Sequence, residues 1–388
     1  MTPTDYNKFG GFFDKVIRDY HGDETGTKKH VTDWFAGNAN YDVKKLGQDE
    51  LSMRVRVGRN LVGFNLPGKM DKHERINFEK RMLPAFDQLI EKYGGKVYSL
   101  TPNFGDDGEN PNLISESKYK ELVDAHVMFK DMAADSYLKS AGIANDWPSG
   151  RGCWQSEDKM RIIWFGEEDQ LRIMCMKKGS DLLEVFTNLN EMLSTVESIE
   201  GIEFAKDENY GYVTSCPSNL GTGMRASVHV KIPNLTSDGT DKKAKEVCKP
   251  LGLSVRGTGG EHTPIGADGT VDISPSARLF IKESEIIGNL YEGIEKLMAI
   301  ENQSPIIIKE VPESSIEESN EASSSPSAAG GEKKEDGPYQ GKAASEPTTG
   351  HSPKHDQLSP TPVLAITTGE ETKAAELSAR NSHYSLKF

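Results

Sequence analysis

Arg161-Ile-Ile-Trp-Phe-Gly166-Glu-Glu-Asp-Gln170-Leu-Arg-Ile-Met-Cys-Met176 contains two apolar runs joined by only five residues. Runs rich in isoleucine and aromatic residues at this separation are typical of a β-hairpin. Further strand candidates lie at residues 51–57, 97–100, 211–216 and 227–232, and the segments 212–215 and 227–232 are a candidate second hairpin. Repeated hairpins predict an antiparallel β-sheet, and the helical patterns between them predict an α+β fold.

Three helices are predicted from start signals and apolar periodicity. Asp71 and Glu74 have the spacing of a capping box, and the apolar pattern that follows ends at a Gly-Gly pair. Pro84 interrupts this pattern and predicts a kink. Asp181 begins a second helix, and apolar residues at helical spacing from 286 to 298 predict a third. We expect these helices to pack on the sheet.

The 388 residues divide into three zones by composition. Residues 1–45 form a short lead-in with an amphipathic segment at 6–20, and residues 46–303 form the main globular body. Residues 304–388 are rich in Ser, Pro, Glu, Ala and Gly. Such a segment buries too little apolar surface to offset its ordering entropy, so we expect a disordered low-complexity tail.

Charge and cysteine usage exclude several classes of protein. The formal net charge of -14 argues against a nucleic-acid binder, which needs a basic face. The four cysteines lack the Cys-x-x-Cys spacing of zinc sites and indicate no disulfide framework, so a reducing compartment is expected. The N-terminus has no signal-peptide pattern, and no apolar run reaches the roughly 18 residues of a membrane span. We therefore expect a cytoplasmic protein without a membrane partner.

The strand candidate Ser52-Met-Arg-Val-Arg-Val-Gly-Arg59 alternates between apolar and polar residues. Successive side chains of a strand point to opposite faces, so Ser52, Arg54 and Arg56 share the face away from the core. The two arginines then stand about 6.6 Å apart along the strand, from a rise of about 3.3 Å per residue. That separation suits successive phosphate groups, whereas a solvated strand face also explains this segment when it is taken alone.

Three more arginines stand at positions that suit anion binding. Arg172 lies on a strand with apolar neighbours, Arg225 opens the strand at 227–232, and Arg256 precedes a Gly-Thr-Gly-Gly loop. His229 shares the polar face of that strand, a position more typical of a surface histidine than of a ligand contact. Neither a Walker A motif nor a strand-to-helix Gly-x-Gly-x-x-Gly is present, so a nucleotide would be held by arginines. Guanidinium forks match phosphate oxygens.

Carboxylates and a cysteine are the candidates for acid–base chemistry. Glu167, Glu168 and Asp169 are adjacent in the hairpin turn, where they form either an ordinary polar loop or, beside arginines, the source of a general base. Their mutual repulsion opposes full ionisation, and nearby arginines favour it. Cys216 is either a small buried residue or a reactive thiol, because the Ser218 hydroxyl could hydrogen-bond to a thiolate and lower its pKa.

Together, and in this order along the chain, these motifs resemble the ATP:guanido phosphotransferases, the phosphagen kinases such as arginine kinase and creatine kinase. The similarity runs from about residue 5 to 303, and its elements lie at 52–59, 146–148, 167–172, 216–225 and 256–263. The resemblance implies a glutamine-synthetase/guanido-kinase-like catalytic domain, in which α-helices flank an antiparallel sheet. It also implies reversible transfer of the ATP γ-phosphoryl group to a guanidino compound, the family's energy-buffering reaction.

The matching positions imply a role for each candidate residue. The implied phosphate contacts are Arg54, Arg56, Arg172, Arg225 and Arg256. The other implied nucleotide contacts are Ser52, His126, His229, Gly257, Thr258, Gly259, Gly260, Glu261 and Asp272. Glu168 would orient and deprotonate the guanidino group, Cys216 would contact it, and Glu261 would add a second carboxylate. ATP or ADP with Mg²⁺ is expected, and phosphate oxygens and water would hold the Mg²⁺, so no protein metal ligands are assigned.

Two segments bear on the small guanidino substrate. Glu261-His262-Thr263 is similar to the guanidino-side loop of arginine kinases, where creatine kinases usually carry Val-Asp-Thr, and it favours arginine or a compound such as taurocyamine. The match to the family's helical N-terminal domain begins partway through, near Asp5. The unmatched part normally carries a loop that closes over this substrate, so we expect weaker closure, in which water competes for the phosphoryl group.

Two alternatives stay open. Bacterial-type protein-arginine kinases also lack the helical N-terminal domain, and Arg225-Ala-Ser-Val228 is similar to theirs, whereas Glu261-His262-Thr263 and the match at 5–22 argue against this assignment. A truncated relative that binds nucleotide and acts as a scaffold through its acidic tail is the non-catalytic alternative. The presence of every candidate catalytic residue counts against it. The oligomeric state is also open, with a homodimer as one option.

Overall fold

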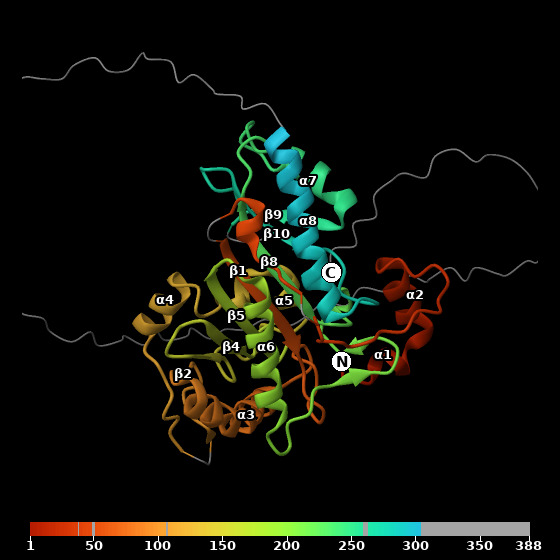
Figure 1. Cartoon of the computed structure of the whole chain (residues 1–388). Helices are drawn as coiled ribbons and strands as arrows, with labels where there is room; N and C mark the ends of the chain where they lie inside the picture. Colours follow the sequence, from red (N-terminus) through yellow and green to blue (C-terminus); the bar gives the residue numbers. More distant parts are fainter. Residues whose placement is uncertain (38, 49–50, 106–107, 259–262, 304–388) are drawn as a thin grey trace, which may run out of the picture. The chain divides into compact units, whose positions relative to one another are not determined.

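The computed structural model describes residues 1–303 except 38, 49–50, 106–107 and 259–262. Within these residues an eight-stranded antiparallel sheet has the order β2-β3-β4-β5-β1-β8-β10-β9 (Figure 1). The strands are β1 Leu51–Arg59, β2 Lys96–Ser99, β3 Gly152–Gln155, β4 Arg161–Phe165, β5 Leu171–Gly179, β8 Met224–Lys231, β9 Leu253–Arg256 and β10 Thr270–Pro275. The predicted antiparallel sheet and α+β class are confirmed, as is the hairpin of β4 and β5.

Strand β1 lies in the middle of the sheet, bonded to β5 on one side and to β8 on the other. The predicted alternation is confirmed, because Met53, Val55 and Val57 are fully buried. Arg54 and Arg56 lie on the opposite face and are only half-buried. One strand therefore joins the hydrophobic core to the polar face of the sheet.

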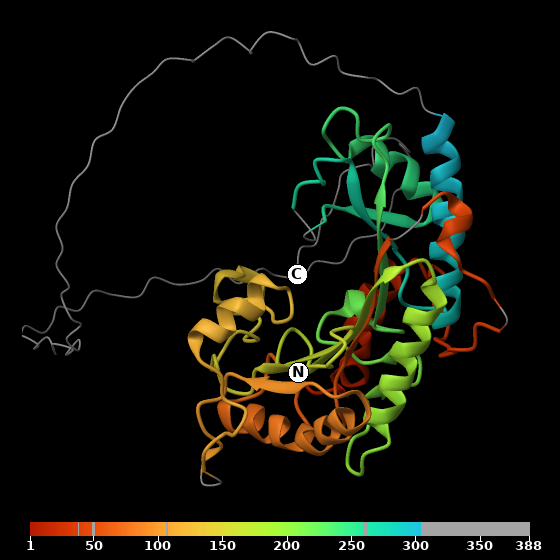
Figure 2. The ribbon, with the colours of Figure 1, turned by 60° about the vertical axis from the view of Figure 1, so that its left-hand side comes forward.

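Three long helices cover the apolar face of the sheet (Figure 2). They are α3 Lys72–Tyr93, α6 Leu182–Glu197 and α8 Glu283–Gln303. Helix α6 packs on β1 and β5, α8 packs on β8 and β10, and α3 packs against α6. Phe86, Leu189 and Leu290 from these helices share one core with Val55 of β1. The arginine-bearing face is the one that these helices leave uncovered.

The predicted helix starts are confirmed. Asp71 accepts a hydrogen bond from the backbone N–H of Glu74 at 2.8 Å, and Asp181 accepts from the first turn of α6. The capping box is not reciprocal, because the Glu74 carboxylate instead accepts two hydrogen bonds from Asn65. Pro84 lies inside the continuous helix α3, so the proline does not divide it.

A smaller group of elements covers part of the opposite face. Helix α4 Glu116–Asp124 and the segment after it form a second core with Cys153, Ile162 and Met174 of β3, β4 and β5. Shorter elements are α5 Ser136–Ser140, α7 Lys242–Cys248 and 3₁₀ turns at Val43–Leu46, Met132–Ala134, Pro217–Asn219 and Lys249–Leu251. None of the helices in the described ranges is long and apolar enough to cross a membrane.

The N-terminal segment forms two helices rather than the single amphipathic piece that was expected. They are α1 Asp5–Lys8 and α2 Gly10–Tyr20, with the break at Phe9. Tyr6 and Ile17 from these helices form a third core with Val213 and Leu220, which flank the loop that carries Cys216. The N-terminal helices therefore pack against a loop that is distant in sequence.

The predicted pairing of residues 212–215 with 227–232 is wrong, and the strand expected at 211–216 is shorter. Strand β7 is only Gly211–Tyr212 and pairs with β6 Lys206–Asp207, whereas β8 lies between β1 and β10. Residues after Tyr212 leave the strand because their polar groups bond elsewhere. The N–H of Ser215 donates to Asp169, and the Thr214 hydroxyl donates to the carbonyl of Cys216.

Candidate active site

Strand register aligns several arginines on the uncovered face of the sheet. Arg56 on β1 lies directly opposite Arg225 on β8. Antiparallel partners share a face, with Cβ atoms about 5 Å apart. Arg172 on β5 lies opposite Gly58 of β1. Arginines that are far apart in sequence thus form one cationic surface.

Asp272 on β10 organises the neighbouring part of this surface. It lies opposite His229 on β8 and Arg256 on β9. Its Oδ2 is 2.6 Å from Nη2 of Arg225, and its Oδ1 is 3.8 Å from Nε2 of His229. Ser274 Oγ accepts a further hydrogen bond from Nε of Arg225 at 3.1 Å. Burial lowers the pKa of Arg225 to about 10, although Asp272 opposes this effect, so the guanidinium stays charged at neutral pH.

Arg54 and Arg56 have no ion-pair partner within the part of the chain that the structure describes. Burial lowers the pKa of both guanidinium groups, and repulsion from Arg172 lowers that of Arg56 further. A half-buried cation without a counter-ion is less favourable than a solvated one unless a ligand supplies the opposite charge. This pair of arginines therefore makes the surface a candidate anion site.

The carboxylates of the β4–β5 turn face Arg172. Glu167 Oε2 is 2.7 Å from Nη2 of Arg172, and Glu168 Oε2 is 3.8 Å from the same nitrogen. The guanidinium carbon of Arg172 lies 5.3 Å from the ring centroid of Trp164, in cation–π geometry. Burial raises the pKa of Glu168 to about 7, and repulsion from Asp169 and Glu167 adds to this effect. A pKa near neutral pH suits a candidate general base.

Asp169 has a structural place in the same turn. Its Oδ1 accepts hydrogen bonds from Asn60 Nδ2 at 2.8 Å and from the N–H of Ser215 at 2.6 Å. A Cβ on Gly58 would lie 2.5 Å from its other oxygen, so only glycine fits there. Asp169 therefore ties the β4–β5 turn to the segment that leads to Cys216.

Cys216 lies beside these carboxylates. Its Sγ is 2.9 Å from Oγ of Ser218, so the predicted contact is present. Burial raises the pKa of the thiol above its ordinary value, hydrogen bonds from Ser218 partly offset this, and Glu168 and Asp169 raise it again. Ser218 therefore acts in the expected direction, but burial outweighs it in this state.

The other predicted nucleotide contacts lie at the border of the arginine surface. Trp164 Nε1 donates to the carbonyl of Val127 at 2.6 Å, which fixes the segment beside His126. His126 is exposed and has a positive φ of 57°. Ser52 is exposed on the same face of β1 as Arg54. Both side chains are exposed to solvent.

The glycine loop after β9 is only partly described. A Cβ on Gly257 would lie 2.0 Å from the carbonyl oxygen of Thr263, so the two ends of the loop touch at a position that needs glycine. Thr258 is exposed. Three of the predicted site residues lie outside the described residues, namely Gly259, Gly260 and Glu261.

Comparison with known proteins identifies the family. Residues 77–304 match the family model described as ATP:guanido phosphotransferase, C-terminal catalytic domain. The chain belongs to the ATP:guanido phosphotransferases. The testis creatine kinase of Oncorhynchus mykiss is 38% identical to this phosphotransferase over 306 residues, which are 77% of the chain and 74% of the relative.

Two further relatives extend the comparison. The taurocyamine kinase of Schistosoma mansoni is 37% identical over 299 residues, which are 76% of this phosphotransferase and 38% of that longer protein. The crystal structure of lombricine kinase superposes with a TM-score of 0.65 at 30% identity, covering 78% of this chain and 79% of the other. The sequence resemblance to phosphagen kinases is thus confirmed at the level of family and fold.

Sequence patterns did not single out Arg278, which interacts electrostatically with candidate site residues. Its charge interacts with those of Arg256, Cys216 and Glu168, and burial lowers its pKa. Its carbonyl oxygen accepts a hydrogen bond from the N–H of Thr222 at 3.0 Å. Arg278 follows β10 in a segment with neither strand alternation nor a glycine loop, so only the fold brings it to the site.

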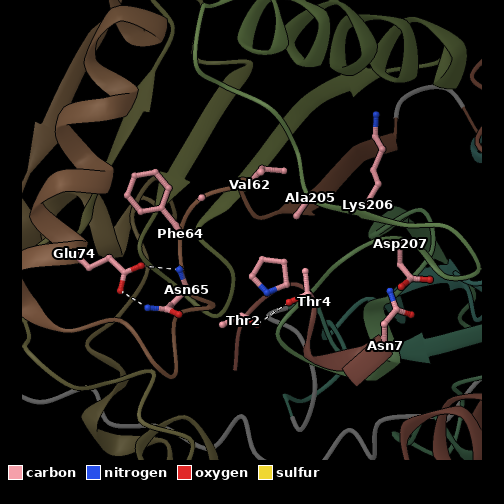
Figure 3. Close-up of a pocket in the computed structure, with 12 residues that line it drawn as sticks. Thr2, Thr4, Asn7, Val62, Phe64, Asn65, Glu74, Ala205, Lys206 and Asp207 are labelled. Carbon is pink, nitrogen blue, oxygen red and sulfur yellow. Dashed lines mark hydrogen bonds between the residues drawn. The ribbon is translucent and has the colours of Figure 1, made fainter. Parts of the chain in front are cut away.

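A separate hollow of about 350 Å³ lies between the first residues of the chain and residues 62–65 and 205–207 (Figure 3). Pro3, Val62 and Phe64 form part of its wall, and none of the predicted site residues lines it. The carboxylate of Glu74 in this hollow already accepts both of its hydrogen bonds from Asn65. Lys206 is the one cation among the lining residues, so the hollow lacks the group of arginines expected at a phosphate site.

Proposed function

We propose that this phosphotransferase transfers the γ-phosphoryl group of ATP reversibly to arginine or a taurocyamine-like compound. Transfer to a guanidino group is the activity of its family, and the choice of acceptor is our proposal. The main support comes from Arg54, Arg56 and Glu168, which belong to the same candidate site. The two arginines are half-buried and lack an ion-pair partner in the described residues, and the pKa of Glu168 is about 7.

The nucleotide half of the proposed site consists of the arginine surface. Phosphoryl transfer depends on alignment and charge neutralisation more than on covalent chemistry by the protein. We assign phosphate binding to Arg54, Arg56, Arg172, Arg225 and Arg256. Further nucleotide contacts are assigned to Ser52, His126, His229, Asp272 and the loop at 257–261. Fixed guanidinium groups would stabilise charge on the transferring phosphoryl group without moving during the reaction.

The guanidino half consists of Glu168, Cys216 and Glu261. In the forward reaction a guanidino nitrogen forms a bond to the γ-phosphorus as the bond from that phosphorus to the bridging oxygen breaks, and ADP leaves with the electron pair. The nitrogen's proton goes to the Glu168 carboxylate and from there to solvent. Cys216 contacts the guanidino group. A carboxyl with a pKa of about 7 both accepts and returns this proton at neutral pH, which suits a reversible reaction.

We place Mg²⁺ on the nucleotide rather than on the protein. Within the described ranges, no group of three or more His, Cys, Asp and Glu side chains is arranged to hold a metal ion. Mg²⁺ usually binds substrate phosphates and water with few protein ligands. When bound there, it would add to the neutralisation of charge on the transferring group.

The acceptor is inferred from Glu261-His262-Thr263, which is similar to the corresponding loop of arginine kinases. Creatine is the second candidate, because the matched creatine kinase is 38% identical. The taurocyamine kinase is 37% identical, so overall identity does not separate the two acceptors. A second carboxylate at position 261 would pair with a guanidinium that carries no bulky N-methyl group.

The deciding experiment measures coupled ADP release with arginine, taurocyamine, creatine and an arginine-rich protein as acceptors, with Glu168→Gln as the inactive control. We expect turnover with arginine or taurocyamine at least tenfold above that with creatine. Preference for creatine would reject our acceptor, and preference for the protein would favour a protein-arginine kinase. ADP binding without turnover of any acceptor would favour a nucleotide-binding scaffold.

A further inference from the structure

The loop that carries Cys216 is held from outside the active site by the N-terminal helices. The hydroxyl of Tyr6, a fully buried residue of α1, donates to the carbonyl oxygen of Thr214 at 2.9 Å. His21, directly after α2, places Nε2 3.0 Å from the carbonyl oxygen of Pro217. The backbone is therefore held two residues before the cysteine and one residue after it.

The same helices enclose both ends of this loop in apolar contacts. Val213 and Leu220, which flank the loop, are buried with Tyr6 and Ile17 in the third core. The aromatic ring of Tyr6 packs edge-on against Phe13 at 4.9 Å between centroids. Apolar packing fixes where the loop starts and ends, and the two hydrogen bonds fix its path between those points.

On the inner side, the loop is held by the β4–β5 turn. The N–H of Ser215 donates to Asp169, a neighbour in sequence of Glu168. The thiol of Cys216 then lies against the hydroxyl of Ser218. The loop is thus fixed between Asp169 on the active-site side and two side chains of the N-terminal segment on the other.

We propose that Tyr6 and His21 are positioning residues that fix the backbone on either side of Cys216 and keep its thiol against Ser218, facing the guanidino substrate. The inference rests on the proposed function only in assigning Cys216 to the guanidino half. Tyr6 and His21 act through backbone carbonyls. Removing either side chain therefore changes the surroundings of the thiol and leaves the hydrogen bonds and ion pairs of the arginine surface unchanged.

Four variants of the full chain isolate these contacts. Tyr6→Phe removes one hydroxyl and keeps the ring in the third core. His21→Ala removes the imidazole, whereas His21→Gln keeps an N–H donor for the carbonyl of Pro217. Tyr210→Phe is the matched control, because its hydroxyl donates to Asp14 of α2 at 2.6 Å and does not touch residues 214–217.

The readout is the rate at which iodoacetamide alkylates Cys216, followed by peptide mass spectrometry at pH 7. We expect alkylation about fivefold faster in Tyr6→Phe and His21→Ala, because each loses one hydrogen bond and the released loop exposes a protected thiol. The KM for the guanidino acceptor should rise by a similar factor with the KM for ATP unchanged. His21→Gln and Tyr210→Phe should stay within twofold of the unaltered protein.

Alkylation at the unaltered rate in both Tyr6→Phe and His21→Ala would overturn the inference. Faster alkylation in Tyr210→Phe as well would also overturn it, because any loosening of α2 would then be sufficient. If Tyr6→Phe melts at a much lower temperature than the unaltered protein, the test rests on the two His21 variants. Equal alkylation rates in His21→Ala and His21→Gln would then overturn the inference. Alkylation does not require turnover, so a failure of the acceptor assay leaves this result interpretable.

Discussion

Replacing Glu168 with glutamine should make the enzyme less active and more stable at the same time. The pKa of this carboxyl rises from 4.5 to about 7 on folding. The folded state therefore binds more protons than the unfolded chain between these values, and stability falls as the pH rises through that window. Below about pH 4, where both forms are protonated, the variant and the unaltered protein should be equally stable.

The magnitude follows from the same shift. A change from 4.5 to about 7 corresponds to about 3 kcal/mol of lost unfolding free energy once the carboxylate is ionised, at 1.36 kcal/mol per pKa unit. The Glu168 side chain keeps 27% of its exposure, so screening by solvent reduces this figure. We therefore expect a net gain of about 1–2 kcal/mol at pH 8, which raises the Tm by about 2–4 °C.

The turnover of the same variant should fall by about 10²–10⁴, the usual contribution of a positioned general base. The assays are thermal unfolding from pH 4 to 9 and ADP release over the same range. In the unaltered enzyme, turnover should rise with pH to half its maximum near pH 7 as Glu168 loses its proton.

Glu167→Gln is the matched control, because it removes the neighbouring charge from a 2.7 Å ion pair with Arg172. It should lower the Tm, opposite in sign to Glu168→Gln. A Glu168→Gln protein that melts below the unaltered enzyme at pH 8, or that keeps its turnover, would refute the reasoning.

Three further changes test other parts of the site. Arg225→Ala should weaken ADP binding about 10–100-fold in calorimetry, because charge-assisted hydrogen bonds contribute about 1.5–3 kcal/mol each. Lys231→Ala, on the same strand, should leave ADP affinity unchanged. If Arg225→Ala binds ADP as tightly as the unaltered protein, Arg225 does not belong to the phosphate site. Gly257→Ala should weaken ADP binding because its Cβ would lie 2.0 Å from the carbonyl of Thr263; unaltered affinity would show that the loop tolerates a side chain. Deleting residues 304–388 should leave the cooperative melt in place, and its loss in calorimetric scans would show that the tail takes part in folding.

Sequence patterns predicted the parts of the site that depend on one strand at a time. Alternation along β1 placed Arg54 and Arg56 opposite the buried valines because the period of a strand fixes which side chains share a face. The short β4–β5 turn was predictable for the same local reason.

The features that the patterns missed depend on contacts between distant segments. β10 alternates between polar and apolar residues in sequence, but its polar residues Asp272 and Ser274 are buried because β8 and β9 pair with it on both sides, and that burial depends on the pairing. The ion pair of Arg225 with Asp272 follows from that pairing. Residues 213–216 resemble a strand locally, but the N–H of Ser215 bonds to Asp169 and the carbonyl of Thr214 bonds to Tyr6 instead of to a neighbouring strand.

The electrostatics of the site also link its two halves. Burial, with repulsion from Arg172 and Arg54, lowers the pKa of Arg56, and burial, with repulsion from Asp169 and Glu167, raises that of Glu168, so without substrates each half holds like charges together. Phosphate groups would relieve the first repulsion, and a guanidinium would relieve the second. Phosphates near Arg172 also weaken the attraction that keeps Glu168 ionised, and an acceptor guanidinium restores it. Each substrate therefore improves the electrostatic surroundings of the other, and by linkage the gain in affinity is the same in either order of binding.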